Sequence, residues 1–289
     1  MAAGAFAFSI MSLLVKLAGQ RLPSQEIVFA RSLVVAMLCW ATLRHAGLDA
    51  RGTRRRLLVV RGVLGFIALS CFYYAVIHLP LADATVIQYT NPAFTALLAV
   101  PLLHEKLRVR EFGWVFASLA GVVLMTRPAL LFGGAARLDP FAVTVGVAGA
   151  LFSAAAYVTV RKLGETEHAL VIVLYFATLS VVGSAVPVAL NPVIPRPGEL
   201  ALLAAVGVTT HAGQLLVTKG LSLERAGRAT AISYVQVLFA AGWGALVFGT
   251  IPDVWAFLGA LLVAAGVIGI ANEKGAGAGE GEGADLGAR

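Results

Sequence analysis

Residues 84–94 read ATVIQYTNPAF, and residues 229–239, which lie 145 positions later, read ATAISYVQVLF. In this gapless register the identical pairs are Ala84 and Ala229, Thr85 and Thr230, Ile87 and Ile232, Tyr89 and Tyr234, and Phe94 and Phe239. The same offset relates 109–122 to 254–267, where a phenylalanine and a glycine also match. Chance matches are common among Ala and Val, so the Tyr, Phe and Thr matches carry most of the weight. The sequence therefore predicts one duplicated unit.

The composition excludes a soluble globular protein. Of 289 residues, 59% are apolar and only 13% are charged, and the mean hydropathy is +0.88, so too little polar surface remains to cover a water-soluble core. A helix that crosses a bilayer needs about 20 largely apolar residues, so ten of them would take roughly 200 residues. We predict an all-α polytopic membrane protein.

Apolar runs bounded by Gly, Pro or charged residues predict the membrane-spanning helices. The ten runs cover 2–19, 26–44, 57–77, 82–103, 111–126, 139–161, 168–188, 199–221, 227–249 and 252–271. The first repeat is then 1–126, the second is 139–272, and the Gly-, Ala- and Glu-rich residues 273–289 form a disordered tail. Because five helices are an odd number, the second repeat should be inverted in the membrane around a central cavity, which is the architecture of alternating access.

The positive charge marks topology. A net charge of +7 could indicate nucleic acid in a soluble protein, but the basic residues lie between apolar runs, so we expect no nucleic-acid partner. Sixteen Lys and Arg, Arg61 among them, fall on the face of the even-numbered connections and the C-terminus, and five fall on the other face. Basic residues are retained in the cytoplasm, so both termini should be cytoplasmic, in the cell inner (plasma) membrane.

No signature of an enzyme or of a bound cofactor stands out. The sequence has no phosphate-binding loop, no H-E-x-x-H and no C-x-x-C, and its two cysteines lie inside apolar runs. We therefore predict no catalytic residue, no metal site and no cofactor. An acyltransferase pair of His45 and Asp49 is only a weak signal.

Two helices carry polar stripes at matching positions. In 82–103 the stripe is Thr85, Gln88, Asn91 and Thr95, and in 227–249 it is Thr230, Ser233 and Gln236. Polar side chains are costly in a bilayer, so such a face should turn toward a cavity, or toward another helix in the alternative of simple helix-to-helix hydrogen bonding. The substrate-binding residues predicted from these and the other polar stripes are Gln88, Asn91, Ser233, Gln236, Tyr73, Tyr89, Tyr157, Tyr234, His211 and Gln214.

Two further residues are predicted to have gating or structural roles. Pro92 lacks a backbone donor and should bend its helix at mid-membrane. Arg31 lies well inside 26–44, where a charge needs a partner or water, unless its side chain snorkels to the outer interface. The runs 111–126 and 252–271 are almost wholly apolar with small residues, so they should be packing elements outside the transport path.

Several motifs make the chain resemble a ten-helix member of the drug/metabolite transporter superfamily with two EamA-type repeats. They are Phe29-Ala30-Arg31, Tyr74-Ala75, Leu79-Pro80-Leu81-Ala82-Asp83-Ala84, Gln88-Tyr89-Thr90-Asn91-Pro92, Phe94-Thr95-Ala96-Leu97-Leu98 and His104-Glu105-Lys106. The resemblance implies a basket of helices around a central cavity, with the fifth and tenth helices peripheral. Second repeats of the family often carry Gly-Glu after the ninth helix, but this chain has Gly249-Thr250, so no acidic role is transferred there.

The expected function is secondary transport without ATP. We expect export of a small amphipathic metabolite, such as an amino acid or a derivative, by a monomer or weak homodimer embedded in the lipid bilayer. The alternatives are a membrane-embedded lipid-processing enzyme and an S-adenosylmethionine-type uptake or exchange carrier of the same superfamily.

The distribution of basic residues predicts that reporter domains fused at Gly52 and at Gly198 lie on opposite sides of the membrane. Paired fusions to a reporter active only in the cytoplasm and a reporter active only outside it measure this. Signals from the same side at both positions would contradict the predicted topology.

Overall fold

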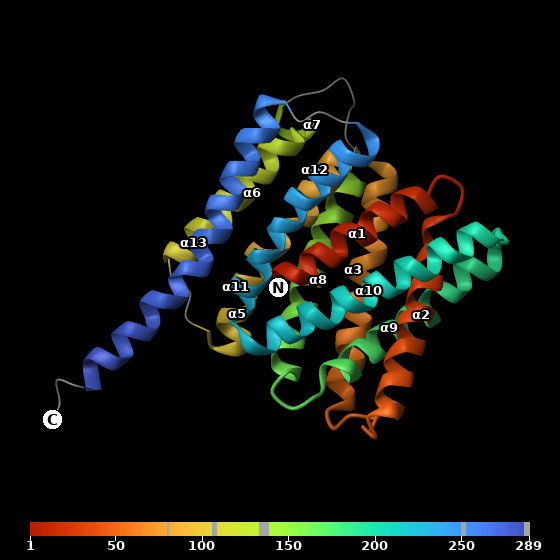
Figure 1. Cartoon of the computed structure of the whole chain (residues 1–289), viewed down its shortest axis with the longest axis horizontal. Coiled ribbons are helices and arrows are strands. Elements are labelled where there is room, and N and C mark those ends of the chain that lie inside the picture. The colour runs from red at the N-terminus through yellow and green to blue at the C-terminus, as the bar shows by residue number, and fades with distance from the viewer. Residues whose placement is uncertain (80, 106–108, 133–138, 250–252, 286–289) are drawn as a thin grey trace.

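The structure is a computed structural model that describes the chain apart from residues 80, 106–108, 133–138, 250–252 and 286–289 (Figure 1). Within the described residues all regular structure is helical. The first copy contains α1 (Ala2–Ala18), α2 (Ser24–His45), α3 (Arg55–His78), α4 (Leu81–Gln88), α5 (Asn91–Leu103) and α6 (Val109–Thr126). The short α7 (Ala129–Phe132) follows, and then α8 (Pro140–Leu163), α9 (Ala169–Leu190), α10 (Pro197–Leu223), α11 (Ala226–Ala231), the 3₁₀ helix η1 (Ile232–Tyr234), α12 (Val235–Phe248) and α13 (Val254–Asp285).

The predicted all-α polytopic membrane fold is confirmed. Nine helical segments of the described chain are long and apolar enough to cross a bilayer, and α1 is a shorter apolar helix of 17 residues. The backbone of α13 is helical as far as Asp285, and the disorder expected over 273–289 stays a prediction. Glycine, which disfavours a helix, recurs at every second position from 275 to 283. Residue 252, the predicted start of the tenth helix, and residues 286–289 lie outside the described residues.

Two of the predicted spans are broken rather than continuous. The run 82–103 forms α4 and α5, and the run 227–249 forms α11, η1 and α12. Pro92 stands in the first turn of α5, where its missing N–H costs no helical hydrogen bond. Pro92 therefore stands at the start of a new helix. The sequence analysis had predicted a bend within one continuous helix instead. At the break Thr90 donates its hydroxyl to the carbonyl of Ile87 at 2.6 Å.

The helix boundaries repeat with the same offset of 145 residues as the sequence. Both ends of α2 match both ends of α9, and α6 and α13 begin at matching positions. The helices α1, α3 and α5 end at positions matched by the ends of α8, α10 and α12. The residues that follow α5 and α12, His104 and Gly249, both adopt the left-handed conformation, with φ of 54° and 66°. The duplication therefore extends to the backbone.

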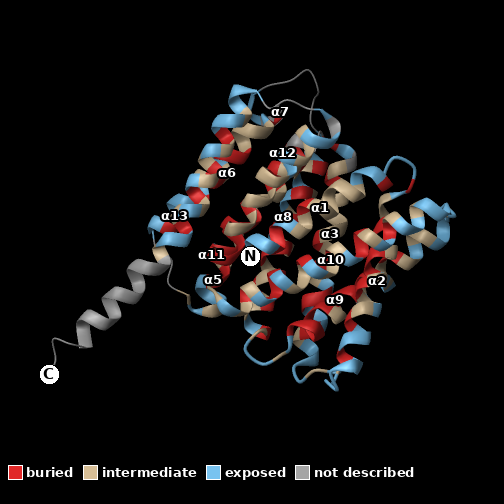
Figure 2. Cartoon of the chain, in the orientation of Figure 1, coloured by how far each residue is buried: buried red, intermediate tan, exposed pale blue. Residues whose placement is uncertain are grey.

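The helices of the two copies interleave. α1 packs on α10 as α8 packs on α3, and α2 packs on α10 as α9 packs on α3. α2 also packs on its own counterpart α9, and one buried cluster joins residues of α2, α8, α9 and α10. Figure 2 shows buried residues along these inner helices and exposed residues along the outer faces. Neither copy has a separate core, so the two copies form one folded unit.

The pair α6 and α13 lies at one side of the bundle, as expected for the fifth and tenth helices (Figure 1). Close approach of the two backbones requires glycine. A Cβ on Gly121 would lie 2.6 Å from the carbonyl oxygen of Gly259 and 2.7 Å from the backbone nitrogen of Val263. Phe116 and Phe257, on the other faces of the pair, are 49% and 62% exposed, as expected for side chains in contact with lipid.

We predict that Gly121→Ala destabilises the protein by about 1–3 kcal/mol, because the new methyl group meets rigid backbone atoms. Gly113→Ala, on the same helix, is the control, because a Cβ there has nothing within 4 Å. It should be neutral or stabilising, since alanine favours a helix over glycine. Thermal unfolding in detergent measures both variants, and equal melting temperatures would contradict the close packing of α6 on α13.

Candidate functional site

The two helix breaks meet through a pair of tyrosines. The rings of Tyr89 and Tyr234 are stacked, with centroids 5.6 Å apart and planes inclined by 28°. The Tyr234 hydroxyl donates a hydrogen bond of 2.8 Å to the backbone carbonyl of Tyr89, and Tyr234 is fully buried. These residues occupy matching positions in the two copies, 145 residues apart. The contact therefore joins the two copies at the point where both polar helices are interrupted.

The predicted polar residues flank this tyrosine pair in sequence. Gln88 and Asn91 stand on either side of the first break, and Ser233 and Gln236 stand around Tyr234. Asn91 is 9% exposed, and the other three are partly buried. The Gln88 Oε1 atom is buried and has no hydrogen-bond partner among the described residues. A free acceptor in this place is available to a bound solute or to water.

A third predicted tyrosine, Tyr157, stands on α8, which packs on α3. It lies one turn after Ser153 on the same helix. Arg61 on α3 is 3% exposed, and its guanidinium lies 4.5 Å from the centre of the Phe176 ring. α3 thus carries a buried arginine on the side that packs on α9.

Arg61 corrects the sequence analysis, which counted it as a topology charge. It lies inside α3, with Nε and Nη1 both buried and without a partner among the described residues. Four apolar residues precede it and mostly apolar residues follow, so the argument that singled out Arg31 could also have found it.

The other predicted residues lie away from the tyrosine pair in their described contacts. Tyr73 is beside Phe72, with ring centroids 6.0 Å apart. His211 on α10 places Nδ1 3.5 Å from the Cys39 sulfur on α2, and Gln214 is half-buried one turn further along α10. His211 therefore has a local partner, and these three residues have no described contact with the tyrosines.

Arg31 is buried inside the protein. The residue is 5% exposed, and its Nη1 lies 3.7 Å from the Met11 sulfur of α1. Its Nε has no partner among the described residues. Besides Arg61, Arg31 is therefore a second buried arginine that has no carboxylate partner among the described residues.

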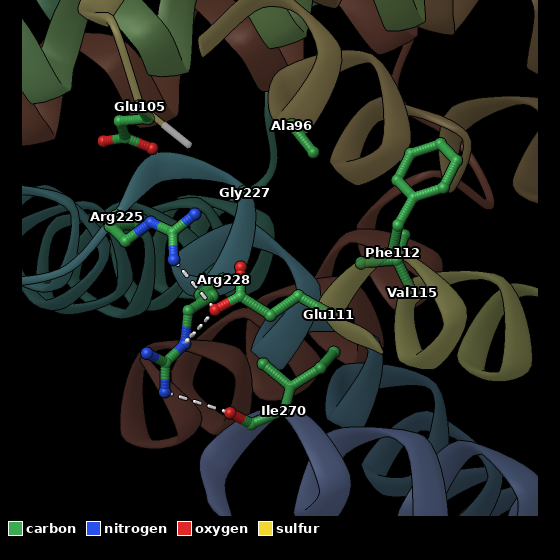
Figure 3. A pocket seen from close by; sticks show the side chains of 9 residues that line it. All are labelled: Ala96, Glu105, Glu111, Phe112, Val115, Arg225, Gly227, Arg228 and Ile270. Carbon is green, nitrogen blue, oxygen red and sulfur yellow. Dashed lines mark hydrogen bonds and ion pairs between the residues drawn. The ribbon is translucent and has the colours of Figure 1, made fainter. Parts of the chain in front are cut away.

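A small charged pocket lies where α5, α6, α11 and α13 come together (Figure 3). Arg225 donates a hydrogen bond of 2.9 Å to Glu111, and Arg228 lies 3.8 Å from the same carboxylate oxygen. Arg228 also donates to the Ile270 carbonyl at 3.1 Å. Opposite-charge pairs with little exposure are strong local ties when their hydrogen bonds are satisfied.

Glu105 extends this charged cluster to α8. Its carboxylate accepts a hydrogen bond from the backbone N–H of Ala226, at the start of α11, at 3.1 Å. Arg161 lies 3.5 Å from the same carboxylate and donates to the Ser222 carbonyl at 2.6 Å. Glu105 thus caps the start of α11. We call the group of Glu105, Glu111, Arg161, Arg225 and Arg228 the charge cluster.

Equivalent contacts between a loop and the start of a helix occur at the two ends of the bundle, and the acidic and basic partners are exchanged between them. At one end Arg21 donates from Nε to Glu199 at 2.6 Å and from Nη2 to the Ile194 carbonyl at 2.9 Å. At the other end Glu167 accepts from the Thr53 N–H at 2.8 Å and from the Arg54 N–H at 2.5 Å. Burial tends to raise the pKa of Glu167, but the hydrogen bonds from Arg54 and Thr53 outweigh it and hold the pKa below its ordinary value. Arg54 and Glu199 occupy matching positions in the repeat.

Comparison with known proteins agrees with the duplication and the fold. Residues 1–127 and 140–272 each match the EamA-like transporter family. The chain is 33% identical over 271 residues to a protein of Pseudomonas aeruginosa named pseudopaline exporter CntI, with 93% of each chain covered. It is 31% identical to human solute carrier family 35 member G1, over 93% of this chain and 77% of that protein.

A solved structure has the same fold. It is titled "Crystal structure of protein" and superposes with a TM-score of 0.79 at 17% identity, covering 92% of this chain and 93% of the other. Both copies match one family, and the expected resemblance to two EamA-type repeats is confirmed. This multi-pass membrane protein belongs to the EamA-like transporter family.

Proposed function

We propose that this transporter exports a small amphipathic metabolite, such as an amino acid or a derivative, across the inner membrane without ATP. The family and the relative named an exporter support movement of a metabolite. The sequence contains no phosphate-binding loop, which favours gradient-driven or facilitated transport. The observation that carries the proposal is the Tyr89–Tyr234 contact, which places matching breaks of both copies against each other.

The two copies are proposed to be inverted in the membrane, with both termini in the cytoplasm. Three observations support this arrangement: the first copy contributes four spans and the shorter apolar α1 while the second contributes five spans, the helix boundaries repeat, and the packing partners are exchanged between copies. Five spans would return the second copy to the opposite side, and the axis relating the copies would lie in the membrane plane. Tyr89 and Tyr234 would then lie near the midplane.

The substrate is proposed to bind around this tyrosine pair. Gln88, Asn91, Ser233 and Gln236 would supply hydrogen bonds, and Tyr89, Tyr157 and Tyr234 would supply ring contacts. The free acceptor of Gln88 supports this assignment. The break before Pro92 provides a place where α4 and α5 can change their relative angle as access changes.

The charge cluster is proposed to close the cytoplasmic end. It ties the ends of α5 and α8 and the start of α6 to the start of α11, so these elements cannot separate while the ion pairs hold. The Arg21–Glu199 pair would be the corresponding tie at the outer end. Alternating access requires that such ties break in turn.

We predict that Gln88→Ala or Gln236→Ala weakens substrate binding by about two- to tenfold, because one neutral hydrogen bond contributes about 0.5–1.5 kcal/mol. Uptake by proteoliposomes of a panel of amino acids and S-adenosylmethionine identifies a substrate, and its binding constant is then measured for each variant. Phe257→Ala is the control, because that side chain is 62% exposed on α13. Unchanged affinity in both glutamine variants, at normal expression, would place the binding site elsewhere.

We predict that Glu111→Gln opens the charge cluster, because Arg225 and Arg228 lose their shared anionic partner. A single cysteine at Phe112, which lines the pocket, reports this opening in a background where Cys39 and Cys71 are replaced by alanine. A loss of about 1 kcal/mol from the closed state corresponds to about fivefold faster labelling by a membrane-impermeant maleimide.

The control for this labelling is Asp253→Asn, which removes the carboxylate paired with Arg127 at the other end of α6. It should leave the labelling rate of the Phe112→Cys reporter unchanged. Equal rates in the Glu111→Gln variant and its parent would contradict a gating role for the cluster.

A further inference from the structure

The arginines in the interior of this protein fall into two classes, those with a carboxylate partner and those without one among the described residues. Arg161, Arg225 and Arg228, in the charge cluster, each lie within 4 Å of a glutamate carboxylate, at distances of 3.5, 2.9 and 3.8 Å. Arg61 is more buried than Arg228, at 3% against 8% exposure, yet it has no ion pair among the described residues. An arginine side chain stays protonated in proteins, so Arg61 cannot avoid the cost of burial by losing its proton. Its charge needs a partner.

The guanidinium of Arg61 reaches toward the middle of the membrane. The Cβ position on Gly65, one turn later, would be only 2.3 Å from Arg61 Nη1, so the side chain extends along α3 over that glycine. Gly65 is the eleventh residue of α3, which places it about 15 Å along the helix, or about half the thickness of the hydrocarbon core. The side chain thus extends away from the nearer interface, opposite to a snorkelling arginine.

The groups around Arg61 are suited to an anion that carries an aromatic or apolar arm. The Phe176 ring lies under the guanidinium, and Tyr157 stands on α8, which packs on α3. A cation–π contact offsets only part of the cost of a buried charge. The remaining unpaired donors fit an acceptor that comes from outside the chain.

We propose that Arg61 binds the carboxylate of the transported metabolite, with Tyr157 as a second donor and the Tyr89–Tyr234 pair against the rest of the molecule. This inference rests on the proposed function and narrows the substrate class to carboxylates. A guanidinium matches a carboxylate because two parallel N–H groups can bind its two oxygens. Lipid phosphates are the other source of an anion, but they lie at the interface, about 15 Å from the membrane midplane.

The test is the thermal stabilisation of purified protein by matched pairs of probes, in phosphatidylcholine nanodiscs. L-phenylalanine is compared with 2-phenylethylamine, and L-methionine with 3-(methylthio)propylamine, because each amine lacks only the carboxylate. A ligand that binds the folded state raises the melting temperature. We expect the wild-type protein to be stabilised by the acids and not by the amines, and we expect Arg61→Met to weaken acid binding by about tenfold or more.

The melting temperature without ligand separates binding from a structural role. Methionine can still pack on Phe176, and it removes an unpaired buried charge, so Arg61→Met should melt at or above the wild-type temperature. A structural Arg61 would instead give a lower melting temperature and an unchanged response to the acids. Arg44→Met is the matched control, since the Arg44 guanidinium also lies over a ring, that of Trp40 at 4.7 Å, but is exposed. It should keep the full response to the acids.

Several outcomes would overturn the carboxylate site. They are equal stabilisation of the wild-type protein by acids and amines, no stabilisation by any acid, and an Arg61-dependent stabilisation that appears only in phosphatidylglycerol nanodiscs. Transport of the amines but not the acids would also overturn it and would leave the proposed transporter function intact. Uptake of neither class, together with no uptake of the wider panel, would contradict the proposed function as well.

Discussion

A buried polar group inside a bilayer must find its partner within the protein, because the surrounding lipid offers none. This constraint accounts for most polar contacts of the structure. Glu105 satisfies the start of α11, Glu111 holds two arginines, and the Tyr234 hydroxyl donates to the carbonyl of Tyr89. The groups left over are therefore informative. Arg31, Arg61 and the Gln88 acceptor are enclosed in the interleaved bundle without full partners among the described residues, and on α6 the Ser118 hydroxyl is another such group.

The duplication gives the two halves the same backbone, and the side chains make them different. Position 31 of α2 corresponds to Phe176 of α9, and Arg61 of α3 corresponds to Val206 of α10. In the helix pair α3 and α9, the arginine is Arg61 on α3. In the equivalent pair α10 and α2, the arginine is Arg31 on α2. Arg21–Glu199 and Glu167–Arg54 show a similar reversal at the two ends. Because the two copies share one backbone, two conformations of similar energy are possible. Because their charges differ, the two conformations can bind a solute with different affinities.

The sequence predicted the features that depend on periodicity and missed those that depend on tertiary contact. The 145-residue register and the apolar runs located the helices within a few residues and placed Tyr89 and Tyr234 at matching positions. The break at Pro92 was expected only as a bend, because a proline in the first turn of a new helix has the same local sequence. Arg61 was misassigned since its depth depends on Gly65 and Phe176.

The central claim is that the two interleaved copies open one end of the bundle while closing the other. Electron–electron distance measurements between spin labels test it most directly, with one pair at Leu48 and Leu223 and a second pair at Leu131 and Ile194, all exposed positions. In liposomes with a transported solute, the account predicts two distance populations at each end, and conditions that lengthen the first pair should shorten the second. Distances that change at one end while the other end stays fixed, or that lengthen together, would contradict alternating access.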